Sequence, residues 1–214
     1  DCGTADNVSR TDIVTFTTIA TPISDFPYYQ TFEDLDNDPI SIEFRNEYVN
    51  KWVIGTATGV EEEAGSGETT TSLYIFNDNG ESNAYSTNPT CYASAIMPVL
   101  FGENSEYVLS FDYKLVGESL ASTKYDYFML FMCDSEVNIP ANGQPQGSGV
   151  TVLMDKQTDI PTWTHVSINL SNVSNTPKQI VFYWRNDNSG GSNPPIAIDN
   201  ISIVGVDCEA PSNL

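Results

Sequence analysis

The residue whose position most clearly calls for chemistry is Asp199, a carboxylate inside an apolar stretch. Residues 194–204 (PPIAIDNISIV) predict a β-strand, and its period of two places Asp199 on the same face as Ile201 and Ile203. A charge on a face that packs into a core is costly unless it is neutralised, and a bound cation is a common solution in a small β-sandwich. The alternative is a bulge or turn at Asp199 and Asn200 that carries the carboxylate into solvent.

A second set of acids, near the start of the chain, offers partners for Asp199. Glu33 follows a short aromatic segment, and Asp36 lies in the acidic loop after it. If the first and last strands of the sandwich are neighbours, Glu33 and Asp199 come together, and each disfavours ionisation of the other. Calcium removes this penalty because it accepts about six to eight hard oxygen ligands. We therefore predict a structural calcium site formed by Glu33, Asp36 and Asp199.

Exposed aromatic rings are the second kind of chemical feature, because the apolar faces of sugars stack on them. Alternation places Trp163 on the strand face opposite Val166 and beside His165, so Trp163 is a candidate platform with His165 as a polar neighbour. The alternative is an outer-face tryptophan that a loop covers. Trp184 borders a polar loop, residues 185–191, and has the same two interpretations. The predicted ligand-binding residues are Trp163, His165 and Trp184.

The sequence offers little for catalysis. It contains one histidine and lacks the Gly-x-Ser-x-Gly, His-Glu-x-x-His and phosphate-binding glycine motifs of common hydrolases and nucleotide-binding enzymes. Paired carboxylates for glycoside hydrolysis remain open, but 29 acidic residues guarantee close pairs somewhere, so no pair is informative. We predict that the chain is not an enzyme.

Composition limits the partners that the chain can bind. Twenty-nine acidic against eight basic residues give a formal net charge of -21, which argues against nucleic acid and anionic membranes. No apolar run approaches the roughly 18 residues that a membrane span needs. A hydrophobic content of 40% is typical of a globular chain. The charge favours a secreted or cell-surface protein that holds hard cations on oxygen ligands.

The elements that must position these residues are short strands. In residues 107–115, Tyr107, Leu109 and Phe111 alternate with polar side chains, whereas residues 127–132 are apolar throughout and predict a central strand buried on both faces. Many such segments, abundant turn residues and no amphipathic helix predict an all-β fold. We expect two antiparallel sheets packed face to face as a β-sandwich. Its predicted core includes Phe111, Phe128, Leu130, Ile168, Phe182 and Ile201.

The four cysteines match no zinc-binding spacing. Cys91 and Cys133 fall within the predicted sandwich, and we predict a disulfide between them; two buried free thiols are the alternative. Cys2 and Cys208 lie in the flanking segments, where we expect them to pair outside the domain or to stay free.

Seven segments follow one another along the chain: residues 26–33 (FPYYQTFE), 50–55 (NKWVIG), 72–75 (SLYI), 109–113 (LSFDY), 117–118 (GE), 125–127 (YDY) and 197–203 (AIDNISI). Taken in this order, they resemble the cleaved-adhesin or choice-of-anchor J domain, a MAM-like jelly roll of surface proteins in Bacteroidetes. This resemblance implies a two-sheet antiparallel jelly-roll β-sandwich. The resemblance covers roughly residues 26–205. Residues 14–18 and 208–214 resemble the last and first strands of fibronectin type III modules. We therefore divide the chain into residues 1–23, the end of a preceding module or linker; 24–206, the jelly roll; and 207–214, the start of a following module or linker.

The resemblance implies a non-catalytic adhesion or carbohydrate-binding module of a secreted multidomain protein. It also implies calcium where the first and last strands meet, held by Glu33 and Asp199, with Asp36 a looser match. Asp112 and Asp126 match family positions too, without an assigned role. The expected partner is a glycan or a host or matrix protein. The alternatives are a structural spacer between fibronectin-like modules and an accessory domain of a secreted hydrolase.

Overall fold

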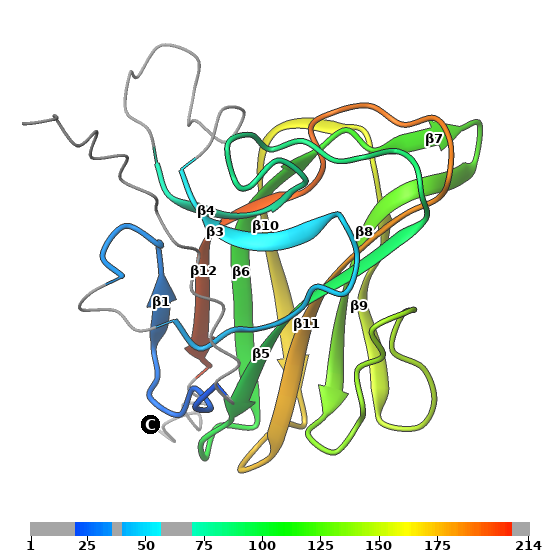
Figure 1. The fold of residues 1–214 in the computed structure, drawn as a ribbon. Coiled ribbons are helices and arrows are strands. Elements are labelled where there is room, and N and C mark those ends of the chain that lie inside the picture. The colour runs from blue at the N-terminus through cyan, green and yellow to red at the C-terminus, as the bar shows by residue number, and fades with distance from the viewer. Residues whose placement is uncertain (1–19, 36–39, 57–69, 207–214) are drawn as a thin grey trace, which may run out of the picture.

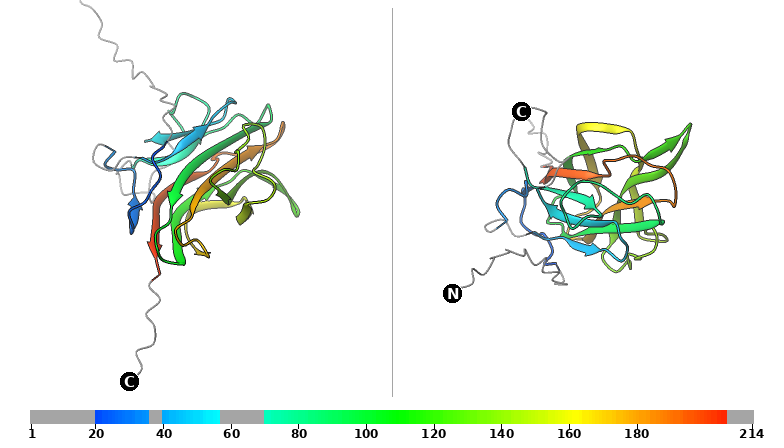
Figure 2. Two further views of the ribbon diagram at one scale, coloured as in Figure 1. Left: turned by 90° about the horizontal axis from the view of Figure 1, so that it is seen from below. Right: turned by 45° about the horizontal axis from the view of Figure 1, so that its top comes forward.

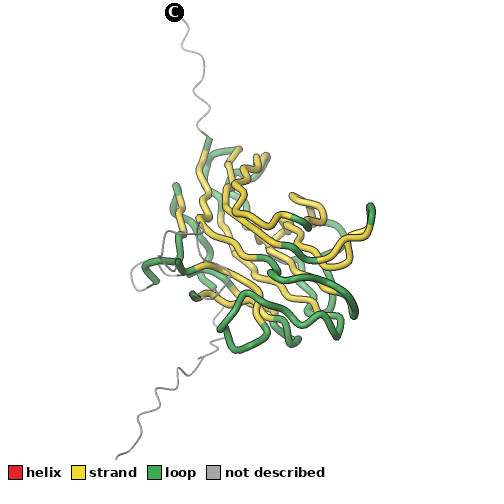
Figure 3. The backbone as a smooth tube through the Cα atoms, turned by 90° about the horizontal axis from the view of Figure 1, so that it is seen from above, coloured by secondary structure: helices red, strands yellow, loops and turns green. Residues whose placement is uncertain are grey.

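The computed structural model describes residues 20–35, 40–56 and 70–206, and these residues form two antiparallel β-sheets (Figure 1). The sheets stack face to face as two layers (Figure 2). Among the described residues there are 12 strands and no helix (Figure 3). This arrangement confirms the predicted all-β jelly-roll sandwich. Because the described part of the chain has no helix, it also has none long and apolar enough to cross a membrane.

The first sheet has six strands and carries the last strand of the fold at its centre. Strand β12 pairs with β6 on one side and with β4 and β1 on the other, so the first and last strands of the sandwich are neighbours, as the sequence predicts. The strands, in spatial order, are β10 (Ile160–Ser171), β6 (Glu106–Leu115), β12 (Ala197–Gly205), β4 (Ser72–Phe76) and β3 (Lys51–Gly55), with β1 (Tyr28–Gln30) paired to β12.

The second sheet also has six strands, and the chain crosses to it from the first sheet four times, after β1, β4, β6 and β10. Strand β8 lies between β11 and the pair β7 and β9, which confirms that residues 127–132 form an interior strand. The strands, in spatial order, are β2 (Glu43–Arg45), β5 (Cys91–Leu100), β11 (Pro177–Asn186), β8 (Thr123–Asp134) and β7 (Glu118–Leu120), with β9 (Val150–Gln157) paired to β8.

The main core fills the space between the sheets and is rich in aromatic rings. Phe111 of the first sheet contacts Phe182 of the second edge-on, with ring centroids 5.6 Å apart, and Phe128 stacks near Phe182 at 6.4 Å. Five of the six core residues predicted from the sequence are fully buried, and Ile168 is partly buried against them. Edge-to-face and offset contacts of this kind stabilise a core beyond the area that they bury.

A smaller apolar cluster covers the outer face of the second sheet. Met129, Phe131 and Tyr183 point away from the main core and pack against Ile139, which comes from the loop after β8. This second cluster explains why β8 is apolar on both faces, since each face of the strand is covered.

The predicted Cys91–Cys133 disulfide is wrong. Both thiols are buried and free. Cys91 is paired in register with Asn186 at one end of β11, and Cys133 with Gln179 at the other. At about 3.3 Å per residue along a strand, these positions are roughly 20 Å apart, far beyond the reach of a disulfide. Burial raises the pKa of Cys133 to about 11, so this thiol stays protonated and inert at neutral pH.

The flanking segments lie mostly outside the described residues. Residues 1–19 and 207–214, including Cys2 and Cys208, belong to this undescribed part, so the fibronectin-like assignment stays a prediction. Ile23, the last residue of the predicted N-terminal segment, packs in the main core and forms a parallel bridge with Val99. The sandwich therefore extends at least to Ile23.

Candidate functional site

Strand β12 contains a β-bulge that changes the expected position of Asp199. Asn200 adopts a left-handed φ of 52°, and the register against β6 shifts between Asp199 and Ser202. The extra residue reverses the alternation, so that Ile198 before the bulge and Ile201 after it both face the core. The prediction that Asp199 shares a face with Ile201 is therefore wrong. The bulge does not carry the carboxylate into solvent either, since Asp199 is only 3% exposed.

The carboxylates of Asp199 and Glu33 hold two consecutive residues that lead into β4. Asp199 Oδ2 accepts a hydrogen bond from Ser72 Oγ at 3.2 Å, and Asp199 Oδ1 accepts one from the backbone N–H of Asn200 at 2.7 Å. Glu33 Oε1 accepts the backbone N–H of Thr71 at 2.8 Å. The structure thus places the two predicted calcium ligands beside the start of β4, next to the central strand β12.

The third predicted ligand, Asp36, lies outside the described residues. Within the described ranges, no additional histidine, cysteine, aspartate or glutamate joins Glu33 and Asp199 to form a group of three potential metal ligands. The calcium site of Glu33 and Asp199 therefore remains a prediction that rests on two carboxylates, both of which already accept hydrogen bonds.

Trp163 and His165 lie on the outer face of the first sheet. Trp163 is half-buried against Tyr74 and Phe76, and the ammonium group of Lys114 sits 4.6 Å from the centre of its ring. One part of the indole is therefore occupied by protein, and the rest is accessible. The side chain of His165 is 62% exposed.

Beside Trp163, a line of polar side chains runs across β10, β6 and β12. His165 Nδ1 lies 2.8 Å from Asp112 Oδ1, and Ser167 Oγ lies 3.3 Å from His165 Nε2. Asn200 Nδ2 donates to Asp112 Oδ2 at 2.8 Å, and Ser110 Oγ lies 2.9 Å from Ser167 Oγ. The order Asp, His, Ser is that of a hydrolase triad, but these side chains stand on an open strand face. Stabilisation of a transition-state oxyanion is strong only where water is excluded, so this line suits hydrogen bonding to a polar ligand better than acyl transfer.

Trp184, the third predicted ligand-binding residue, is part of the core. Its side chain is 0% exposed and meets Tyr85 edge-on, with ring centroids 5.2 Å apart. Alternation along β11 turns Phe182 and Trp184 inward, whereas Tyr183 faces the outer cluster. The loop that begins at Arg185 therefore follows the tryptophan without exposing it, and the prediction that Trp184 is a binding platform is wrong.

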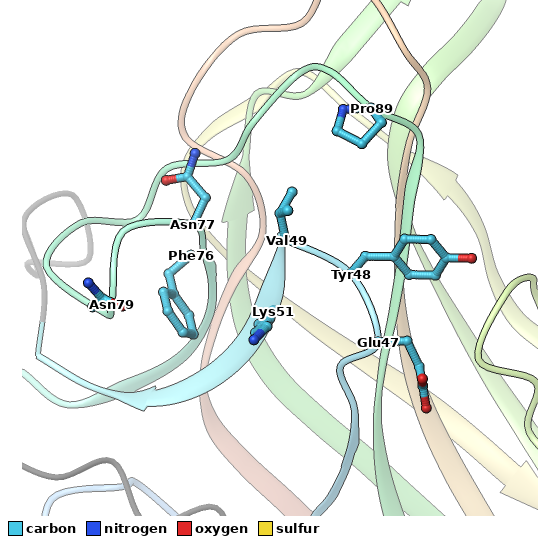
Figure 4. A pocket seen from close by; sticks show the side chains of 8 residues that line it. All are labelled: Glu47, Tyr48, Val49, Lys51, Phe76, Asn77, Asn79 and Pro89. Atoms are coloured by element: carbon cyan, nitrogen blue, oxygen red, sulfur yellow. The ribbon is translucent and has the colours of Figure 1, made fainter.

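A surface hollow of about 530 Å³ opens where the start of β3 meets the end of β4. Figure 4 shows the exposed side chain of Val49 between Asn77 and Pro89, with Tyr48 on one side and Phe76 on the other. Its volume falls within the range of small-molecule sites. The hollow combines apolar surface with amide, carboxylate and ammonium groups, and it is lined by Glu47, Tyr48, Val49, Lys51, Phe76, Asn77, Asn79 and Pro89.

Phe76 connects the hollow with the surface around Trp163. Phe76 lines the hollow. It also belongs to a small apolar cluster on the outer face of the first sheet, formed with Tyr74 and Ala197, against which Trp163 packs. The two features therefore adjoin on the same side of the sandwich. Sequence patterns did not indicate the hollow, because Glu47 comes from the loop between β2 and β3, whereas Asn77 and Pro89 come from the two ends of the loop between β4 and β5. The meeting of these segments depends on the tertiary fold.

A cluster of three carboxylates lies in the second sheet, where β7 and β8 pair beside the end of β11. The sequence patterns did not indicate it. Glu118, Asp126 and Asp187 each place one oxygen within 4.8 Å of the others, so together they could hold a metal ion. Burial, followed by the nearby charges of Asp126 and Asp187, raises the pKa of Glu118 above its usual range. Burial likewise raises the pKa of Asp126. The only sequence signal was that Glu118 and Asp126 fall in two family-like segments.

The raised pKa of Glu118 predicts a pH-dependent stability in chelator. Asp126, Asp187, Arg185 and Tyr85 are the ionisable groups that influence this site. Because the pKa is higher in the folded protein than the ordinary 4.5, ionised Glu118 opposes folding at neutral pH. This penalty disappears as the pH falls through the raised pKa toward 4.5. In chelator, Glu118→Gln should therefore melt above the wild type at neutral pH, by a margin that shrinks in acid. Thermal melts between about pH 4 and pH 8 measure this margin, and a margin independent of pH would contradict the prediction.

The sequence matches no family model and no curated protein, whereas solved structures resemble the fold. The K1 cleaved adhesin domain of Lys-gingipain from Porphyromonas gingivalis has a TM-score of 0.52 and 16% identity over 86% of this chain and 100% of that domain. The CBM22-1 xylan-binding domain of Paenibacillus barcinonensis Xyn10C has a TM-score of 0.48 and 13% identity, covering 88% of this chain and 99% of that one. A cyclase from Fischerella sp. TAU has a TM-score of 0.45 and 12% identity, covering 90% of this chain and 100% of that one.

These comparisons define a class of fold. The chain is a jelly-roll β-sandwich with the architecture of an adhesin domain. A shared fold does not determine function, which depends on the side chains at the surface of this chain.

Proposed function

We propose that the chain is a non-catalytic carbohydrate-binding or adhesion module of a secreted, multidomain surface protein. The observation that carries this proposal is the hollow of about 530 Å³, which adjoins the surface around Trp163 through Phe76. Sugar recognition combines an apolar or aromatic surface with side chains that hydrogen-bond hydroxyl groups. The hollow supplies Tyr48 and Val49 for the first role, and Asn77 and Asn79 for the second.

The ligand that suits this surface is a neutral glycan. A formal net charge of -21 repels acidic polysaccharides at long range. Amide groups hydrogen-bond neutral hydroxyls without needing a charged partner. The polar line around His165 and Asp112 extends the hydrogen-bonding surface from the edge strand β10, which carries Trp163, across β6 to Asn200 of β12. We therefore assign Trp163 and His165 to the binding surface and replace Trp184 with the residues of the hollow.

The proposal includes a structural calcium ion between Glu33 and Asp199, with Asp36 as a third ligand. The support is that both described carboxylates lie beside Thr71 and Ser72, and that Asp199 is buried although it is an acid. Calcium would neutralise this pair and fix the loop after β1 to the start of β12. The module would be flanked by fibronectin-like segments, outside the residues that the structure describes.

A glycan array tests the proposal. The 214-residue chain, labelled and kept in calcium, should bind a subset of neutral oligosaccharides. Trp163→Ala and Asn77→Ala should reduce the signal, whereas Tyr29→Ala, which truncates an exposed tyrosine on β1, should not. Binding only to host or matrix proteins would replace the glycan by a protein ligand. Binding to neither would favour a structural spacer.

A further inference from the structure

Two carboxylates of the acidic cluster face each other across a β-ladder. Glu118 on β7 is the register partner of Asp126 on β8. Like charges directly opposite in an antiparallel pair are destabilising, so this pairing is unfavourable without a further group. Asp187, the first residue after β11, adds a third negative charge to the same place.

The backbone of the loop after β11 closes against these carboxylates. Gly117 and Ser192 exchange two backbone hydrogen bonds, of 3.2 and 3.0 Å, which tie the loop to the start of β7. A Cβ atom added to Gly190 would lie 2.2 Å from Glu118 Oε1, and both residues 190 and 191 have left-handed φ angles. Only glycine allows the chain to pass so close, and its passage shields the carboxylate oxygens from water.

The hydrogen-bond donors around the cluster are too few for three carboxylates. Asp126 is fully buried and accepts the hydroxyl of Tyr85 at 2.6 Å and the backbone N–H of Asp187 at 2.8 Å. Asp187 Oδ1 accepts the backbone N–H of Ser189 at 2.9 Å. Glu118 Oε2, by contrast, has less than 1 Å² of accessible surface and no hydrogen-bond partner among the described residues.

Nor does a basic side chain neutralise the cluster. In the part of the chain that the structure describes, no lysine, arginine or histidine forms an ion pair with Glu118, Asp126 or Asp187. A buried carboxylate oxygen without a donor is costly, and the cost rises beside two further acids. The buried, unpartnered oxygen of Glu118 points to a positively charged ligand at the centre of the three side chains.

We propose that Glu118, Asp126 and Asp187 bind a divalent cation of the calcium type. The ligand set is entirely oxygen, which suits a hard cation rather than zinc or copper. Oxygens up to 4.8 Å apart fit opposite sides of a calcium ion, whose bonds are about 2.3–2.6 Å long; magnesium, at about 2.0–2.1 Å, would require them closer. This site goes beyond the proposed glycan binding and is separate from the Glu33 and Asp199 pair. Its cation would fasten the loop after β11 to the β7–β8 hairpin.

Terbium luminescence tests the proposal, because Tb³⁺ replaces calcium and Tyr85 lies against the site. The full chain, stripped with chelator, should give tyrosine-sensitised terbium emission that calcium displaces. Glu118→Gln should lower the calcium affinity at least tenfold and remove most of the emission. Asp155→Asn, which removes an exposed carboxylate from β9, and Asp199→Asn should both keep the emission.

Melting temperatures provide a second readout with opposite signs. In chelator, Glu118→Gln should melt above the wild type, because it relieves repulsion among the three acids. In saturating calcium the order should reverse. Unchanged emission and calcium affinity in Glu118→Gln would overturn the proposal. Loss of all calcium binding in Asp199→Asn would also overturn it, because calcium would then bind at the Glu33 and Asp199 pair and not at Glu118.

Discussion

Trp184→Ala is expected to lower the free energy of unfolding by about 3–5 kcal/mol, the usual cost of truncating a fully buried aromatic side chain. Trp184 is 0% exposed and packs edge-on against Tyr85, so its removal leaves a cavity between the sheets. Trp163→Ala should cost only about 1–2 kcal/mol, because Trp163 is only partly buried, on the outer face of the first sheet. Urea denaturation of both variants measures the difference.

Trp184→Phe is the matched control for this comparison. It keeps an aromatic ring in the core and removes an indole N–H that has no acceptor among the described residues. Its loss of stability should therefore be well below that of Trp184→Ala. Equal losses in Trp184→Ala and Trp163→Ala would contradict the assignment of one tryptophan to the core and the other to the binding surface.

Calcium at a hundredfold excess over its dissociation constant is expected to stabilise the Glu33 and Asp199 site by about 2.7 kcal/mol. The cation binds the folded pair only, since residues 166 positions apart do not meet in the unfolded chain. The experiment is best done in the Glu118→Gln background, which disables the second proposed site. There, Asp199→Ala should abolish the rise in melting temperature.

The same variant separates calcium binding from ordinary hydrogen bonding. Asp199→Ala also removes the acceptor for Ser72 and Asn200, which should cost about 1–3 kcal/mol in chelator and in calcium alike. If Asp199→Ala lowers the melting temperature of the Glu118→Gln protein by the same amount in chelator and in calcium, Asp199 serves hydrogen bonds alone. If Asp199→Ala lowers the melting temperature more in calcium than in chelator, the result supports the metal site.

The strand pattern of the fold was predictable because burial imposes a period of two. Tyr107, Leu109 and Phe111 alternate along β6 and are all buried, as predicted. Residues 127–132 are apolar throughout because β8 is covered on both faces. Such a pattern can be recognised within a single strand, without knowing which strands lie beside it.

Positions that depend on a break in the pattern were not predictable. The bulge at Asn200 reverses the faces of β12, so simple alternation placed Asp199 with the wrong isoleucines. A bulge inserts one residue, and an Asp-Asn pair alone does not say whether it is present. The prediction for Trp184 failed for a related reason. The polar loop beside it indicated exposure, but Trp184 lies on the face of β11 that packs into the core.

The acidic cluster required knowledge of strand pairing. Glu118 and Asp126 meet because β7 and β8 form a hairpin in which they are register partners, and Asp187 reaches them from the loop after β11. Among 29 acidic residues, sequence alone offers no reason to select these three. The buried, unpartnered oxygen of Glu118, which distinguishes the cluster from an ordinary solvated group, exists only in three dimensions.

The central claim, that the hollow and Trp163 form one glycan-binding surface, is tested most directly by calorimetric titration with the oligosaccharide that gives the strongest array signal. The wild type should bind with a measurable affinity. Tyr48→Ala and Trp163→Ala should each weaken binding by about tenfold, equivalent to about 1.4 kcal/mol, whereas Tyr29→Ala should bind like the wild type. Equal affinities in all four proteins, each shown to be folded by its melting curve, would contradict the claim.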